Sequence, residues 1–101
     1  MSGHGPISFR AERAVLVALL EGASSTRVFL TVRGDRMVMS SPVGAKEITV
    51  GGEVDGWISV DRSGLLAVLR ECDDPGVRIC TAPFGQVVIE DRQGVERGRT
   101  S

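Results

Sequence analysis

The chain has 101 residues, 42% of them hydrophobic and 25% charged, which predicts one globular domain with a single core. Its formal net charge of −1 excludes attraction to nucleic acid or acidic lipid by bulk electrostatics, so a DNA contact needs locally clustered cations. The longest apolar run, residues 14–20, is far shorter than the roughly 20 residues of a membrane span. Residues 1–6 lack the features of a secretory signal, and we expect a cytoplasmic protein without membrane contacts.

The first half of the chain predicts one helix and four strands. Residues 1–6 are polar and Gly-rich, and we expect a flexible N-terminus there. Strict alternation of apolar and polar residues marks residues 26–33 as a half-buried strand. The other expected elements, in chain order, are a strand over residues 7–9, a helix over residues 11–21, a hairpin partner over residues 36–40, and a strand over residues 47–50 that ends at Gly51 and Gly52.

The second half predicts the same kinds of element in the same order. Either Asp61 or Ser63 can cap its helix, because both side chains carry an oxygen that accepts from free amides of the first turn. Residues 94–101 resemble the N-terminus in composition, so we expect a flexible tail there and a single domain over residues 7–93. The expected elements are a strand over residues 57–60, a helix over residues 64–72, and strands over residues 77–81 and 86–91.

An internal duplication underlies this order. Ile7-Ser8 returns as Ile58-Ser59, and a shift of 49 residues carries the apolar positions of the first helix onto those of the second. A repeat of about 50 residues is a supersecondary unit, and one helix with a few strands is too small to bury its own apolar face. We therefore predict an α+β fold built from a duplicated β-α-β-β(-β) unit, with two helices packed on one side of antiparallel sheet.

Helical spacing separates a buried from an outward face on each helix. At 100° per residue, the expected core positions are Val15, Leu16, Leu19 and Leu20 in the first helix, and Leu65, Val68, Leu69 and Cys72 in the second. The outward positions are Ala14, Val17, Ala18 and Glu21 in the first, and Ala67, Arg70 and Glu71 in the second. Both outward faces are close to neutral.

The duplication and its local sequences resemble one domain of the sliding DNA clamps, the family of the bacterial polymerase III β subunit and proliferating cell nuclear antigen. The segments that carry the resemblance are Phe9-Arg10-Ala11, Met37-Val38-Met39-Ser40, Gly56-Trp57-Ile58-Ser59-Val60 and Leu65-Leu66-Ala67-Val68-Leu69. The resemblance implies a non-enzymatic protein whose domains join at sheet edges into a ring, with helices lining a hole that holds duplex DNA. Clamp subunits carry two or three such domains, whereas this chain has one.

The resemblance implies that cations on the helical side contact phosphates without reading bases. Basic residues gather near the two helix starts, and one more lies in the second helix. The candidate DNA contacts are therefore Arg10, Arg13, Arg62 and Arg70. The alternative is that these arginines are solvated charges at helix ends. Two or three phosphates per subunit would give weak, salt-dependent binding unless several subunits acted together.

Two apolar surfaces are candidate partner or subunit interfaces. The first is the small face of the first helix, formed by Ala14, Val17 and Ala18, which either receives a partner or lies under the loop 42–46. The second is formed by Phe29 and Trp57, which alternation places on the outward side of their strands. These aromatics are either partner anchors or an ordinary, partly covered surface.

The sequence shows no set of catalytic or metal-binding residues. His4, the only histidine, lies in the expected flexible end, and no phosphate-binding glycine loop is present. Cys72 and Cys80 form no redox or zinc motif, so we expect no cofactor and no metal. Two functions follow: a clamp-like module that self-associates and tethers DNA-processing proteins to duplex DNA, or a protein-interaction module with the same fold and no DNA binding.

Overall fold

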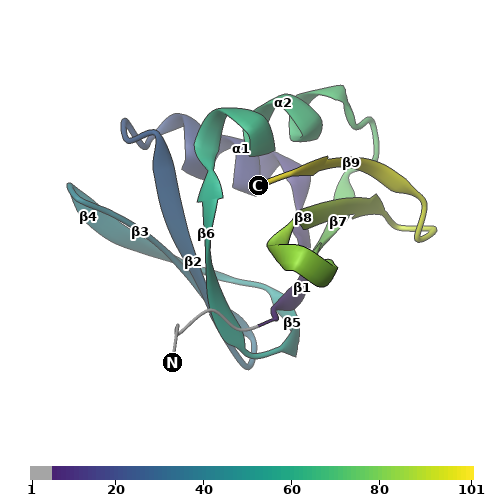
Figure 1. The fold of residues 1–101 in the computed structure, drawn as a ribbon, viewed down its shortest axis with the longest axis horizontal. Helices are drawn as coiled ribbons and strands as arrows, with labels where there is room; N and C mark the ends of the chain where they lie inside the picture. The colour runs from purple at the N-terminus through teal and green to yellow at the C-terminus, as the bar shows by residue number, and fades with distance from the viewer. Residues whose placement is uncertain (1–5) are drawn as a thin grey trace.

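A computed structural model describes residues 6–101, so the expected flexible N-terminus, apart from Pro6, lies outside the described residues. Two helices lie along the top of the view in Figure 1, with an antiparallel sheet on each side beneath them. The elements are β1 (Ser8–Glu12), α1 (Arg13–Glu21), β2 (Arg27–Arg33), β3 (Arg36–Ser41), β4 (Gly44–Thr49), β5 (Gly51–Val54), β6 (Gly56–Asp61), α2 (Arg62–Glu71), β7 (Gly76–Thr81), the 3-10 turn Pro83–Gly85, β8 (Val87–Asp91) and β9 (Glu96–Thr100).

The duplication is confirmed, and the two halves exchange strands. One sheet has the order β5-β1-β7-β8-β9 and the other has the order β4-β3-β2-β6. The first strand of each half therefore pairs with the three-stranded meander of the other half: β1 with β7, and β6 with β2. Because every sheet contains strands from both halves, neither half can form its sheet alone. Strand β5 lies between the two duplicated units and extends the first sheet beyond β1.

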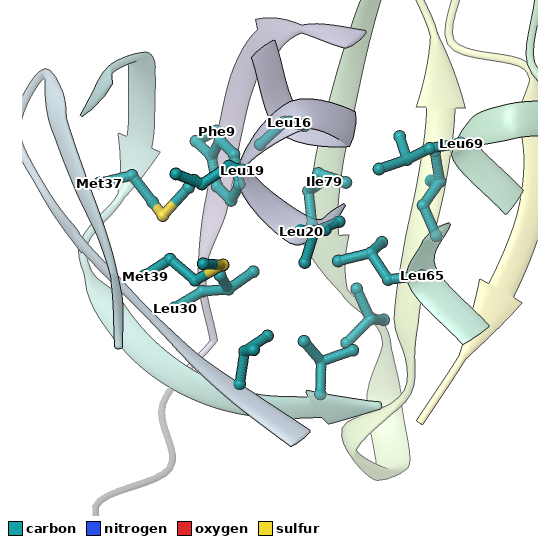
Figure 2. Packing of buried hydrophobic residues seen from close by; sticks show 14 of the residues in the cluster. Phe9, Leu16, Leu19, Leu20, Leu30, Met37, Met39, Leu65, Leu69 and Ile79 are labelled. Atoms are coloured by element: carbon teal, nitrogen blue, oxygen red, sulfur yellow. The ribbon is translucent and has the colours of Figure 1, made fainter. Parts of the chain in front are cut away.

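The apolar faces of both sheets and both helices enclose one core. Phe9, Leu20, Leu65 and Ile79 are each at most 1% exposed, and they come from both halves. Figure 2 shows these side chains converging from the strands and helices, with Met37 and Met39 filling the space beside Leu19. An internal void of about 10 Å³ remains, which is too small for a ligand.

Helix boundaries differ from the predicted ones by one or two residues. α1 begins at Arg13 because β1 continues through Glu12 in register with Gly76 of β7. α2 begins at Arg62 because the Asp61 carboxylate caps it, accepting from the Gly64 amide at 2.7 Å. The predicted core position Val15 is wrong: its side chain is 40% exposed.

The prediction of a flexible tail over residues 94–101 is wrong for Glu96–Thr100. These residues form β9, which pairs with β8 and lies against α2. A methyl group at Gly98 would lie 2.7 Å from a Val68 methyl carbon, so glycine lets the strand approach the helix closely. Likewise, Gly51 and Gly52 belong to β5 instead of ending a strand.

Candidate functional site

The antiparallel contact between the two helices places each helix start beside the end of the other helix. The Arg13 amide donates to the Pro75 carbonyl at 2.8 Å, and the Arg62 amide donates to the Thr26 carbonyl at 2.9 Å. The two donors differ by 49 in residue number, as do the two acceptors, so the bonds are related by the duplication. Each bond satisfies a first-turn amide that has no partner within its own helix.

The side chains of Arg13 and Arg62 also form hydrogen bonds to the opposite helix. The Arg13 Nη1 donates to the Leu69 carbonyl at 3.3 Å in the last turn of α2. Its counterpart Arg62 donates from Nη1 to the Leu20 carbonyl at 3.2 Å in α1, and from Nε to the Ser25 carbonyl at 2.9 Å. A guanidinium group at a helix C-terminus satisfies unpaired carbonyls and opposes the negative end of the helix dipole. Both arginines thus join the helices to each other.

The four candidate DNA contacts do not form one cationic cluster. Arg10 lies on β1, where its exposed side chain pairs with Glu53 of β5 at 3.2 Å. Arg70 lies on the exposed face of α2 and pairs with Glu21 of α1 at 2.7 Å. Arg13 and Arg62 lie at the helix starts with part of each guanidinium bonded to carbonyls. Their contact with DNA stays a prediction.

The outward face of the helix pair is small and nearly uncharged. Ala14 and Ala18 are exposed on α1, whereas Val17 is half-buried and packs against the core. The loop 42–46 does not cover the two alanines, because its hairpin lies beside the C-terminal end of α1. There it forms a groove of about 320 Å³ lined partly by Leu19 and Val43.

The two aromatic candidates lie together on the outer face of the four-stranded sheet. Phe29 of β2 is 41% exposed and Trp57 of β6 is half-buried. Their ring centroids are 5.8 Å apart with an interplanar angle of 52°, an arrangement typical of favourable aromatic contacts. The sequence placed both outward from alternation alone, and the cross-strand contact comes from the register of β2 with β6.

The outer face of the five-stranded sheet holds a charge network that sequence reasoning missed. The Glu53 carboxylate accepts from the Ser8 hydroxyl at 2.5 Å and from Arg78 at 2.7 Å, besides its pair with Arg10. Arg78 also pairs with Glu90 at 2.8 Å. Beneath this layer, burial raises the pKa of the Cys80 thiol. The sequence pattern does not predict this network, because Glu53 lies on β5, the strand outside the duplication.

The pH dependence of the free energy of unfolding below pH 7 should reveal how much this network stabilises the fold. The hydrogen bond from Ser8, with those from Arg78 and Arg10, lowers the pKa of Glu53 from 4.5 to about 2. A lowered folded-state pKa gives stability that is fully present above pH 4.5 and is lost as the pH falls towards 2. We expect Glu53→Gln to lower the free energy of unfolding by about 1 kcal/mol at pH 7 and by less at pH 3, measured by urea denaturation. Glu47→Gln, at an exposed ion pair on the other sheet, is the control, and an equal pH dependence in both variants would refute the assignment.

No set of three His, Cys, Asp or Glu side chains between residues 6 and 101 is arranged to hold a metal ion. Cys72 and Cys80 are free thiols, the first of them buried. Among the described helices, none is long and apolar enough to cross a membrane.

Comparison with known proteins identifies the fold. No family model and no curated protein sequence matches the chain. Several solved structures do, among them the β sliding clamp of C. crescentus, with a TM-score of 0.73 and 20% identity, and a putative DNA polymerase III β subunit from Eubacterium rectale ATCC 33656, with a TM-score of 0.72 and 16% identity. Each match covers 94% of this chain but only 28% and 29% of the other chain, respectively. The chain therefore has the fold of a sliding-clamp domain and spans less than a third of these relatives.

Proposed function

We propose that this chain is a non-enzymatic, clamp-type module that joins other copies through its sheet edges and tethers DNA-processing proteins to duplex DNA. The observation that carries the proposal is that β4 and β9, which are related by the duplication, each form one edge of a sheet; β6 and β5 form the opposite edges. An edge strand presents unpaired backbone groups to another chain. Pairing β4 of one copy with β9 of the next would continue a sheet between copies, and such head-to-tail contacts close into rings when the rotation allows.

The helix pair would face the DNA in such an assembly. Figure 1 shows the two helices together along one side of the molecule, with both sheets beneath them. Arg70, in the last turn of α2, is the candidate contact on the outward helix face, with a side chain 56% exposed. Each copy presents few cations, which implies weak DNA binding by one subunit and retention of DNA by several subunits together. We propose that this occurs in the cytoplasm, without membrane contact.

Assembly is tested by blocking the β4 edge with proline. In an edge strand the amides alternate between the partner strand and the open side, so one of Ala45→Pro and Lys46→Pro removes a donor from the open edge only. We expect wild-type protein to form a ring-sized oligomer at tens of micromolar by native mass spectrometry. Whichever proline variant keeps the wild-type circular dichroism spectrum should be a monomer. A wild-type protein that is monomeric at this concentration would contradict the proposal.

The second candidate function is a protein-interaction module without DNA binding, and the neutral helix face favours it. Arg70 is paired with Glu21, and Arg13 and Arg62 bond to helix carbonyls, which leaves few free cations for phosphates. Anisotropy of a labelled DNA duplex, measured with the same oligomer, distinguishes the two functions. Salt-dependent retention that weakens in Arg70→Ala but not in Arg92→Ala, another exposed and paired arginine, supports tethering. An assembly that retains no duplex at 50 mM salt supports the interaction module.

A further inference from the structure

The outer face of the four-stranded sheet differs from that of the five-stranded sheet, which ion pairs cover. We name it the aromatic face. By strand register its outward side chains are Arg27, Phe29, Thr31 and Arg33 of β2, Arg36, Val38 and Ser40 of β3, Ala45, Glu47 and Thr49 of β4, and Trp57, Ser59 and Asp61 of β6. Its centre is aromatic, and most of the neighbouring side chains are short.

The two rings stand above these short neighbours. Phe29 pairs across the strands with Ser40 on one side and Ser59 on the other, and Trp57 pairs with Thr31. Ser40 and Ser59 are too short to cover the Phe29 ring, which agrees with its 41% exposure, whereas Trp57 is half-buried. The face therefore presents aromatic surface on a rigid sheet.

A guanidinium group lies beside the rings. The Arg27 side chain crosses from β2 to β6 and donates from Nε to the Ser59 hydroxyl at 2.9 Å and from Nη2 to the Ser59 carbonyl at 3.0 Å. Because Ser59 is the cross-strand partner of Phe29, these bonds hold a planar cation next to the aromatic pair. Arginine planes stack on nucleobases as aromatic rings do.

Two cations of the aromatic face form no ion pair with an acidic side chain among residues 6–101. Glu47 pairs with Arg36 at 2.9 Å, and the Asp61 carboxylate accepts from the amide of Gly64. Arg27 and Arg33 have no Asp or Glu oxygen within 4 Å among these residues, and although Arg27 also donates from Nη1 to the Ser101 oxygen at 3.5 Å, a guanidinium has five N–H groups, so some stay available for a phosphate. They lie six residues apart on β2, about 20 Å along an extended strand, with the aromatic pair between them. An anion that spans both ends of β2 and offers flat groups between them fits this arrangement.

We propose that the aromatic face binds single-stranded nucleic acid by stacking bases on Phe29 and Trp57 and pairing phosphates with Arg27 and Arg33. Single strands expose both base faces and phosphates, whereas duplex DNA hides its bases and an acidic peptide lacks the flat groups. The site lies on the outside of the sheet, away from the helices, so it is separate from the proposed contact with duplex DNA.

The test uses Trp57, the only tryptophan in a chain without tyrosine, as its own reporter. We expect a ten-residue oligo(dT) to quench its fluorescence, with an affinity that falls as salt rises. Anisotropy of a labelled oligo(dT) should show binding about tenfold weaker in Phe29→Ala, the loss expected for one stacked base. Arg33→Ala should reduce the slope of log affinity against log salt by about 0.7, and Arg92→Ala, at an exposed ion pair outside the aromatic face, should match the wild type.

Four outcomes would overturn the proposal. They are no quenching at 50 mM salt, equal binding of a duplex of the same length, equal quenching by polyglutamate, and a fluorescence change with protein concentration alone, which would indicate contact between copies. Circular dichroism establishes that each variant is folded. The proline variants of β4 test assembly without altering the rings, so failure of one proposal leaves the other standing.

Discussion

Arg62→Ala is expected to lower the free energy of unfolding by about 2 kcal/mol, although Arg62 is a candidate DNA contact by sequence. Its guanidinium donates to the Leu20 and Ser25 carbonyls, and hydrogen bonds to charged groups contribute about 1.5 to 3 kcal/mol. Alanine would remove the side-chain donors to the Leu20 carbonyl in the last turn of α1 and to the Ser25 carbonyl beyond it, while the backbone bond to Thr26 would remain. Urea denaturation followed by circular dichroism measures the loss, which corresponds to about 10 °C in melting temperature for a domain of this size.

Two other arginines are the controls for this prediction. Arg13→Ala should cost about 1 kcal/mol, because Arg13 makes a single carbonyl bond of 3.3 Å and its buried Nε has no partner among the described residues. Arg70→Ala should cost less than about 0.5 kcal/mol, since its ion pair with Glu21 is exposed. If Arg62→Ala were no more destabilising than Arg70→Ala, the link between the helices would not be a stabilising contact.

Gly52→Ala is expected to be the most damaging single methyl addition outside the core. A Cβ atom at Gly52 would overlap the carbonyl oxygen of Gly34, which lies in the turn between β2 and β3. The Gly34 oxygen is a backbone atom, and the Cβ atom is bonded directly to the Gly52 backbone. The overlap can therefore be relieved only by moving β5 or the turn. We expect a loss of about 3 kcal/mol in the free energy of unfolding.

Gly51→Ala provides a matched comparison at the adjacent position. A Cβ atom there would lie 3.6 Å from the Arg10 Cβ, an ordinary van der Waals contact. Alanine at this position should change stability by less than about 1 kcal/mol. Thermal melts of the two variants measure the difference, and comparable melting temperatures would show that β5 moves away from the turn without cost.

The polar edges of the fold were the hardest part to predict. β9 consists of Glu96, two arginines, Gly98 and Thr100, a composition without apolar periodicity. It is a strand because β8, across the preceding turn, supplies the pairing and α2, which is distant in sequence, covers Gly98. Strand β5 is similar, since two of its four residues are glycines that read as a turn.

The duplicated apolar pattern by itself determined the order of elements, the α+β class and most of the shared core, because burial periodicity is a local property of the chain. It also placed Phe29 and Trp57 outward. Only the tertiary structure decided that the halves exchange first strands, that Arg13 and Arg62 bond to the opposite helix, and that Glu53 joins two arginines. These depend on contacts between residues that are 24 to 72 positions apart, which no local pattern of side chains encodes.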